Sequence, residues 1–167
     1  MKKIKIFVWI AVIFILQLTL MHHLTVFGTK ALLVLPFVSV FAVISGSFRN
    51  TLIVSLICGT FTGSLLGYDF FVATTFVALM AIIIFSLKEH FVYMPVIVKI
   101  FLGTFIFSMI WEVVVFCLIV SEILIYKDIL FSHILIVTLY NSVVSILIYP
   151  LLKSTVLENE SRKKPII

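Results

Sequence analysis

The sequence predicts an all-α membrane protein, a bundle of six transmembrane helices with both termini in the cytoplasm. Hydrophobic side chains make up 63% of its 167 residues, and the mean hydropathy is +1.36. Charged residues make up only 11%, against about 25% in an ordinary soluble domain. Between the charges lie six nearly uncharged stretches long enough to cross the hydrocarbon core, which takes roughly 17–25 residues. This composition excludes a water-soluble enzyme and a disulfide scaffold.

Each of the six stretches is predicted to be a helix, because lipid offers no hydrogen-bond partners to an open strand. The first stretch follows a basic start but lacks a small-residue cleavage site, so we predict a retained helix rather than a cleaved signal peptide. The connectors are too short to fold in water, so residues 1–167 form one polytopic domain that ends in a short cytoplasmic tail, residues 153–167. The predicted helices cover about residues 6–24, 31–48, 51–68, 70–87, 100–121 and 129–152.

The lysines and arginines fall mainly on one predicted side of the membrane. With six crossings and a cytoplasmic amino terminus, all of the twelve except Lys30 and Lys127 lie in cytoplasmic segments. This is the positive-inside pattern of a multi-pass membrane protein. The net charge of +5 is therefore interpreted as orienting the chain and contacting anionic membrane lipids, and no nucleic-acid partner is expected.

Glu112 is the one acidic residue inside a predicted span, and it lies close to the middle of the fifth. A charge at that depth costs about 2.5–3.5 kcal/mol on insertion scales, so the carboxyl is expected to be neutral or paired. Asn141 lies at the matching depth of the sixth span, the antiparallel neighbour in sequence. We predict that the two side chains form a hydrogen-bonded polar pair that locks the bundle. The alternatives are a role in coupling protons or a ligand, and a contact with another membrane protein.

The third span carries a stripe of small residues at a spacing of four, which places them on one helix face. Small residues at this spacing let a second helix backbone come close. The stripe is predicted to pack within the bundle or to dock a partner helix. Its members are Thr51, Ser55, Gly59, Gly63 and Gly67.

The connector between the fourth and fifth spans reads KEHFVYMPVIVK, with charges at its ends and mainly apolar residues between them. Aromatic side chains favour the headgroup level of a membrane, so Phe91 and Tyr93 are predicted to lie in the interface near Pro95. This loop is the candidate cytoplasmic contact surface.

No sequence pattern points to catalysis, a cofactor or a metal. The phosphate-binding loop, the serine nucleophile elbow and the zinc-protease motif do not occur in the sequence. Cys58 and Cys117 both fall in apolar spans and are predicted to be packed thiols rather than a disulfide. We therefore expect a protein that is not an enzyme and that holds no cofactor or metal.

In length, number of spans and several short motifs, the chain resembles the bacterial rod shape-determining membrane proteins of the MreD family. In that family an acidic residue commonly occupies the fifth span, and the last span carries a central Asn and a Pro near its cytoplasmic end. The matching segments are Gly59-Thr-Phe-Thr-Gly63, Trp111-Glu112-Val-Val-Val-Phe116, Tyr126-Lys127-Asp128-Ile129, Tyr140-Asn141 and Tyr149-Pro150-Leu151-Leu152-Lys153. One position departs from the pattern: Gly67 stands where the family usually has an Asp, and Asp69 is the candidate substitute.

The resemblance implies a non-enzymatic scaffold of the bacterial plasma membrane. Such a protein would bind the bitopic protein MreC and help connect the cell-wall synthases of the elongation complex to MreB filaments. The main alternative is a substrate-binding subunit of an energy-coupling-factor vitamin transporter, whose overall shape the family is thought to share. That reading requires a polar pocket open to the outside, and it would be favoured by small-molecule binding or copurification with ATPase subunits.

Overall fold

The computed structural model describes residues 2–23, 32–66, 69–119 and 127–161. Within these ranges the chain is helical and has no strand, as the sequence predicts. Its helices are α1 (Lys2–His23), α2 (Val34–Ile44), α3 (Phe48–Leu66), α4 (Phe70–His90), α5 (Val96–Ile119) and α6 (Lys127–Ser161).

Three stretches in these helices are long and apolar enough to cross a membrane. They are Phe70–His90, Val96–Cys117 and Ser132–Ser154, with mean hydropathies of 2.5, 2.2 and 2.0. Shorter apolar stretches occur in α1 and α2, at Ile4–Thr19 and Val34–Ile44. Large hydrophobic side chains are also exposed on the outer faces of α1, α3, α4, α5 and α6. The molecule thus has the character of a helical membrane protein, apolar outside as well as inside.

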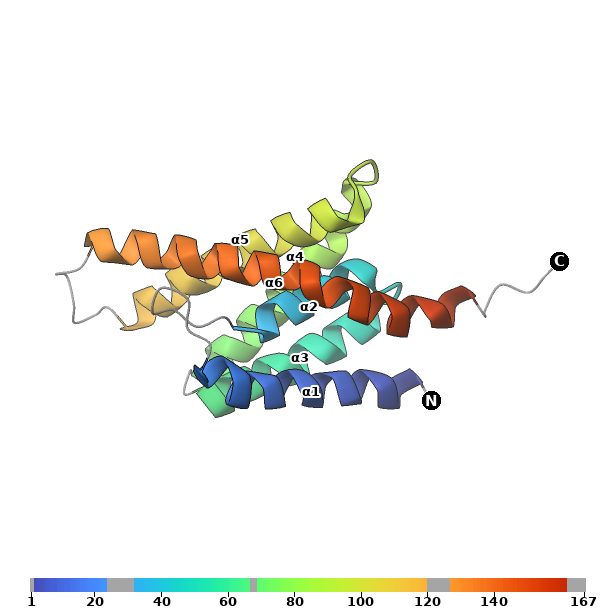
Figure 1. The fold of residues 1–167 in the computed structure, drawn as a ribbon, viewed down its shortest axis with the longest axis horizontal. Coiled ribbons are helices and arrows are strands. Elements are labelled where there is room, and N and C mark those ends of the chain that lie inside the picture. Colours follow the sequence, from blue (N-terminus) through green and yellow to red (C-terminus); the bar gives the residue numbers. More distant parts are fainter. Residues whose placement is uncertain (1, 24–31, 67–68, 120–126, 162–167) are drawn as a thin grey trace.

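Helix α2 lies at the centre of the bundle. All of its residues except Val43 are buried, and it contacts each of the other five helices. Around it, α3 packs mainly against α4, and α5 packs mainly against α6 (Figure 1). The start of α1 and the carboxyl end of α6 lie at the same end of the bundle (Figure 1).

The structure corrects the predicted second span. A helix over residues 31–48 would cross the hydrocarbon, but α2 has 11 residues, which at 1.5 Å per residue is about 16 Å, roughly half of the 30 Å core. The helix ends where Ser45 adopts an extended backbone, at the start of a Ser-Gly-Ser segment. Hydropathy could not reveal this, because a short helix enclosed by protein needs the same apolar side chains as one enclosed by lipid.

Other helix ends also differ from the predicted ones. Helix α4 continues to His90 and α5 already begins at Val96, so the predicted 12-residue connector is mostly helix and the loop itself is short. Helix α6 runs to Ser161, so much of the predicted tail is helical. The predictions placed ends where charges begin, but Lys and Glu are good helix formers and do not end a helix by themselves.

Candidate functional site

The amino end of α2 is held by side chains from two other helices. Leu33, at the N-cap position, supplies no side-chain acceptor, and the chain just before the helix is held from outside it. Instead, the Leu32 N–H donates to Oδ1 of Asn141 on α6 at 3.0 Å. The Leu33 N–H donates to Oε1 of Gln17 on α1 at 2.6 Å. The amides of Gln17 and Asn141 thus hold the two residues that precede α2, while in the first turn the Leu35 N–H donates to the Leu32 carbonyl and Pro36 has no N–H.

Asn141 also joins α6 to α5. Its Nδ2 donates to Oγ of Ser108 at 2.6 Å, and the Asn141 side chain is completely buried. The predicted partner, Glu112, lies one turn further along α5 and is only partly buried. The amide therefore binds Leu32 and Ser108 in place of Glu112. The antiparallel register predicted from the sequence was right to within one helical turn, but it identified the wrong acceptor.

The carboxyl end of α2 is held by Lys88, near the end of α4. The Lys88 ammonium donates to the carbonyl oxygen of Ala42 at 3.5 Å and to that of Ser45. The same ammonium lies over the ring of Phe85, 3.7 Å from its centroid. A cation is favoured here because the last carbonyls of a helix carry partial negative charge. Both ends of the short central helix are thus capped by other helices, and sequence reasoning missed Lys88 because it was counted only as a topological charge.

The small-residue stripe lies largely between α3 and α4. A Cβ added to Gly59 would lie 2.7 Å from Cα of Thr74, and one added to Gly63 would lie 2.7 Å from Cα of Phe70. No side chain fits at either position, because the obstacle is the backbone of α4. Thr51 and Ser55, earlier in the stripe, are buried too.

The last predicted member of the stripe, Gly67, lies outside the described residues. At Gly59 and Gly63 the neighbour is α4, so these two positions are not open to a partner helix. Asp69, the candidate substitute for the missing family Asp, caps the start of α4 by accepting a hydrogen bond from the Val72 N–H at 2.9 Å.

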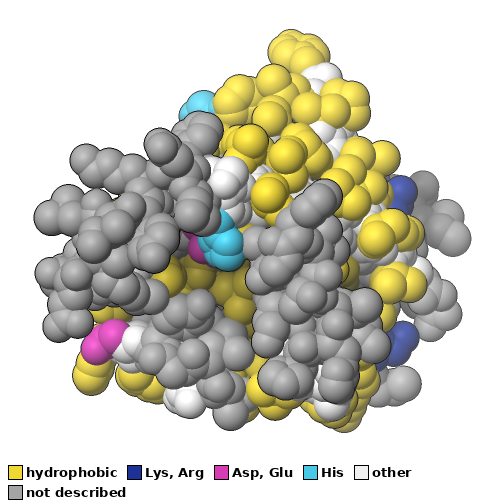
Figure 2. All heavy atoms as spheres, turned by 60° about the vertical axis from the view of Figure 1, so that its left-hand side comes forward, with side chains coloured by type: hydrophobic (Ala, Val, Ile, Leu, Met, Phe, Trp, Pro, Cys, Tyr) yellow, Lys and Arg dark blue, Asp and Glu magenta, His cyan; other side chains and the backbone are white. Residues whose placement is uncertain are grey.

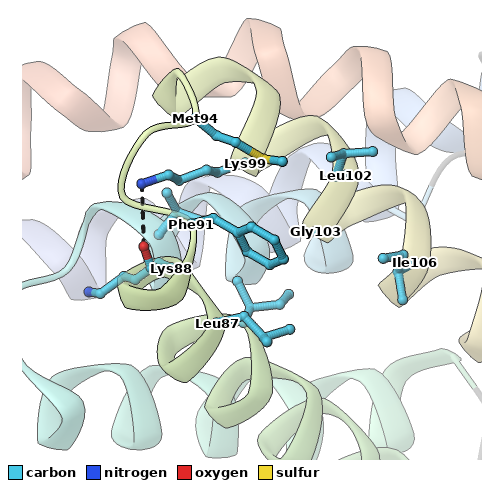
Figure 3. Close-up of a pocket in the computed structure, with 10 residues that line it drawn as sticks. Leu87, Lys88, Phe91, Met94, Lys99, Leu102, Gly103 and Ile106 are labelled. Carbon is cyan, nitrogen blue, oxygen red and sulfur yellow. Dashed lines mark hydrogen bonds between the residues drawn. The ribbon is translucent and has the colours of Figure 1, made fainter.

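The predicted contact loop is exposed. Tyr93 is fully open and Pro95 is exposed, while the half-exposed Phe91 also lines a hollow between α4 and α5. This hollow has a volume of about 120 Å³. Figure 3 shows the Phe91 ring between the two helices, with Leu87 on one side and Leu102, Gly103 and Ile106 on the other.

A second hollow separates α1 from α3. Its volume is about 200 Å³, and Asn50 is the one polar residue in its lining. The remaining lining residues are aliphatic or aromatic: Ile6, Phe7 and Ile10 from α1, and Ile53, Val54 and Ile57 from α3.

Few ionisable side chains gather on the described surface. On the face drawn in Figure 2, most of the coloured side chains are hydrophobic, with a few acidic, basic and histidine side chains among them. Across the part of the chain that the structure describes, no three His, Cys, Asp or Glu residues come together as metal ligands would. Cys58 is a buried free thiol and Cys117 an exposed one.

Comparison with known proteins adds no relative: no family model, no curated protein and no solved structure matches this chain.

Proposed function

We propose that this chain is a non-enzymatic scaffold of the bacterial plasma membrane, similar in role to the MreD proteins of the cell-elongation complex. In this role both termini face the cytoplasm, and the bundle binds an MreC-like bitopic protein and the cell-wall synthases, with MreB filaments as a further partner. The proposal rests on the resemblance of the sequence and on one structural observation, the way in which the interior polar groups are used.

That observation is that the polar side chains around α2 bind the protein's own backbone. Gln17 and Asn141 accept hydrogen bonds from the start of α2, and Lys88 donates to its end. These bonds engage the amide and ammonium groups of Gln17, Asn141 and Lys88, whereas the buried hydroxyls of Ser39, Thr104 and Thr138 have no partner among the described residues. The outer faces, in contrast, carry large apolar side chains. Such a molecule is suited to lateral contact with other membrane helices.

The hollow between α1 and α3 is where we place the single helix of the bitopic partner. Each wall of this hollow includes an exposed side chain, Phe7 on α1 and Ile53 on α3, so the hollow can be reached from the outer surface. A bulky apolar residue of the partner would fill it as a knob fills a hole, while the rest of the partner helix lies along α1 and α3.

The transporter alternative gains less support from this geometry. The two hollows, of about 120 and 200 Å³ and lined only by described residues, are smaller than the 300–1,000 Å³ of typical small-molecule sites. Both are also lined almost entirely by apolar side chains, which would not orient a polar vitamin.

The test is depletion of the protein in a rod-shaped host, followed by complementation with two matched variants. Ile53→Trp fills the hollow between α1 and α3, whereas Leu147→Trp adds the same ring to an exposed site on α6. We expect depletion to round the cells, and Ile53→Trp to lose both the rod shape and copurification of the bitopic partner while Leu147→Trp retains them. Unchanged cell shape on depletion, or copurification of ATPase subunits with a bound vitamin, would refute the scaffold role.

A further inference from the structure

The hollow between α4 and α5 opens sideways, toward the surroundings of the bundle. Buried Ile84 and partly buried Val43 lie at its inner side. Leu102 and Ile106, on α5, line it and are 41% and 52% exposed. Gly103 between them leaves room, because a Cβ added there would be 3.6 Å from the nearest atom, Cγ2 of Ile84. The hollow is thus a side entrance with apolar walls.

The size and chemistry of this hollow restrict its occupant. An apolar hollow does not retain ordered water, and about 120 Å³ is less than half of the roughly 300 Å³ at the lower end of typical small-molecule sites. A whole helix, about 10 Å across, is too wide. A segment of a hydrocarbon chain, a few methylene groups long, has the required width and polarity.

Positive charge lies beside the hollow. The aliphatic stems of Lys88 and Lys99 contribute to its lining. Figure 3 shows both ammonium groups on one side of the Phe91 ring, away from Leu102 and Ile106. The Lys99 ammonium donates to the carbonyl oxygen of Lys88 at 3.3 Å, which uses one of its three N–H groups.

The two lysines differ in what they can offer a ligand. Lys88 is bound to the carbonyl end of α2, so its hydrogen bonds are already directed inward. Lys99 keeps N–H groups that can bind an anion. Exposed Glu89, which is close in sequence, reduces the local positive charge. Basic pockets between transmembrane helices on the cytoplasmic side are typical binding sites for anionic lipid headgroups.

We propose that this hollow binds one anionic phospholipid, with a stretch of acyl chain between α4 and α5 and the phosphate on Lys99. The lysine that would bind the phosphate and the apolar side entrance lie at the same end of α4 and α5, beside the fully exposed Tyr93. That end is the one predicted to face the cytoplasm, and a lysine there attracts the anionic headgroups of the cytoplasmic leaflet. The site requires a membrane but no protein partner, so it stands or fails independently of the scaffold role.

Native mass spectrometry of the purified full-length protein in detergent tests the site. The probes are dioleoyl phosphatidylglycerol and dioleoyl phosphatidylcholine, which share their acyl chains and differ in net charge. We expect phosphatidylglycerol to bind more tightly. Lys99→Gln, which keeps a hydrogen-bond donor but loses the charge, should weaken phosphatidylglycerol binding about fivefold, the factor expected for one lysine near an anionic surface, and leave phosphatidylcholine unchanged.

The matched control is Lys5→Gln, which removes an equal charge from the exposed side of α1, on a helix that does not line this hollow. It should alter neither lipid. Gly103→Leu fills the hollow and should weaken both lipids equally. Equal binding of the two lipids by the wild type, or an equal loss with Lys99→Gln and Lys5→Gln, would overturn the proposal.

A measurement on the unmodified protein guards against a variant that fails to fold. Phosphatidylglycerol with a photoreactive group in its acyl chain should crosslink to peptides that contain Leu102 or Ile106, and unlabelled phosphatidylglycerol should compete. Crosslinks spread evenly over the exposed faces of α1 and α6 would mean that only annular lipid is present, and the site would be rejected.

Discussion

Replacement of Asn141 by leucine should be among the most damaging single changes inside this bundle. Its side chain is fully buried and bridges α6 to α2 and α5 through the Leu32 N–H and the Ser108 hydroxyl. Leucine is close in volume but has no acceptor, so the Leu32 N–H is left buried without a partner. The Ser108 hydroxyl can rotate toward a carbonyl of its own helix, and it is expected to recover most of its loss.

The expected loss of stability follows from the Leu32 N–H, which cannot find another hydrogen-bond partner. An unsatisfied buried donor costs about 1–3 kcal/mol, whereas an average interhelical hydrogen bond in a membrane protein contributes about 0.6 kcal/mol. Because the Leu32 N–H is a backbone group that cannot rotate toward another acceptor, we expect Asn141→Leu to lower the free energy of unfolding by about 2 kcal/mol. Ser142→Ala is the matched control, because Ser142 is equally buried but donates only to the Thr138 carbonyl within α6.

The assay is reversible unfolding in mixed micelles with increasing dodecyl sulfate, applied to the wild type, the two variants, Gln17→Leu and the double variant. The two caps serve adjacent N–H groups at the start of α2. Loss of one should therefore fray that turn and make loss of the other less costly. The reasoning is refuted if Asn141→Leu is no more destabilising than Ser142→Ala, or if the effects of Gln17→Leu and Asn141→Leu add without coupling.

Two further predictions follow from the contacts of α3 and α4. Gly63→Leu should destabilise the bundle by at least about 2 kcal/mol, because the new side chain meets the α4 backbone. Gly103→Ala, the control in the same unfolding assay, should be neutral or slightly stabilising. Equal effects of the two variants would contradict the close packing of α3 on α4. Lys88→Met should lower the free energy of unfolding by about 1–2 kcal/mol, because it uncovers the carbonyl end of α2. Lys99→Met should lower it less, because the Lys99 ammonium reaches only a carbonyl near the end of α4. The reverse order would show that the Lys88 cap is not a stabilising contact.

The sequence predicts well those features that depend on the average environment of many residues. Helices with apolar faces both inside and outside follow from the composition, and the Gly59–Gly63 spacing identified a face of close backbone approach. The fifth and sixth spans were placed as antiparallel neighbours within about one turn of the observed register. Each of these features is set by hydropathy or by side-chain size repeated along a helix.

The sequence predicts poorly those features that depend on backbone groups. The acceptor of Asn141 was taken to be the nearest polar side chain, Glu112, because an inventory of side chains does not show where a buried helix begins. The two residues before α2 present backbone N–H groups that donate to Asn141 and Gln17, while the Asn141 amide itself donates to the Ser108 hydroxyl. A useful signal was present nonetheless: single amides in apolar spans need partners, and an unaccounted helix start supplies them.

The short central helix explains why this apolar interior contains polar side chains at all. A helix that crosses a membrane leaves its unpaired terminal groups near water at both ends, but α2, with 11 residues, begins inside the bundle at buried Leu32 and Leu33 and ends beside Lys88. Each uncapped end would leave backbone donors or carbonyls without partners at a cost of several kcal/mol, and an isolated helix of this length is marginal even in water. Helix α2 therefore depends on α1, α4 and α6 for its ends, which makes its formation cooperative with assembly of the whole bundle. Loss of any one cap should loosen the centre first and the surrounding helices only afterwards.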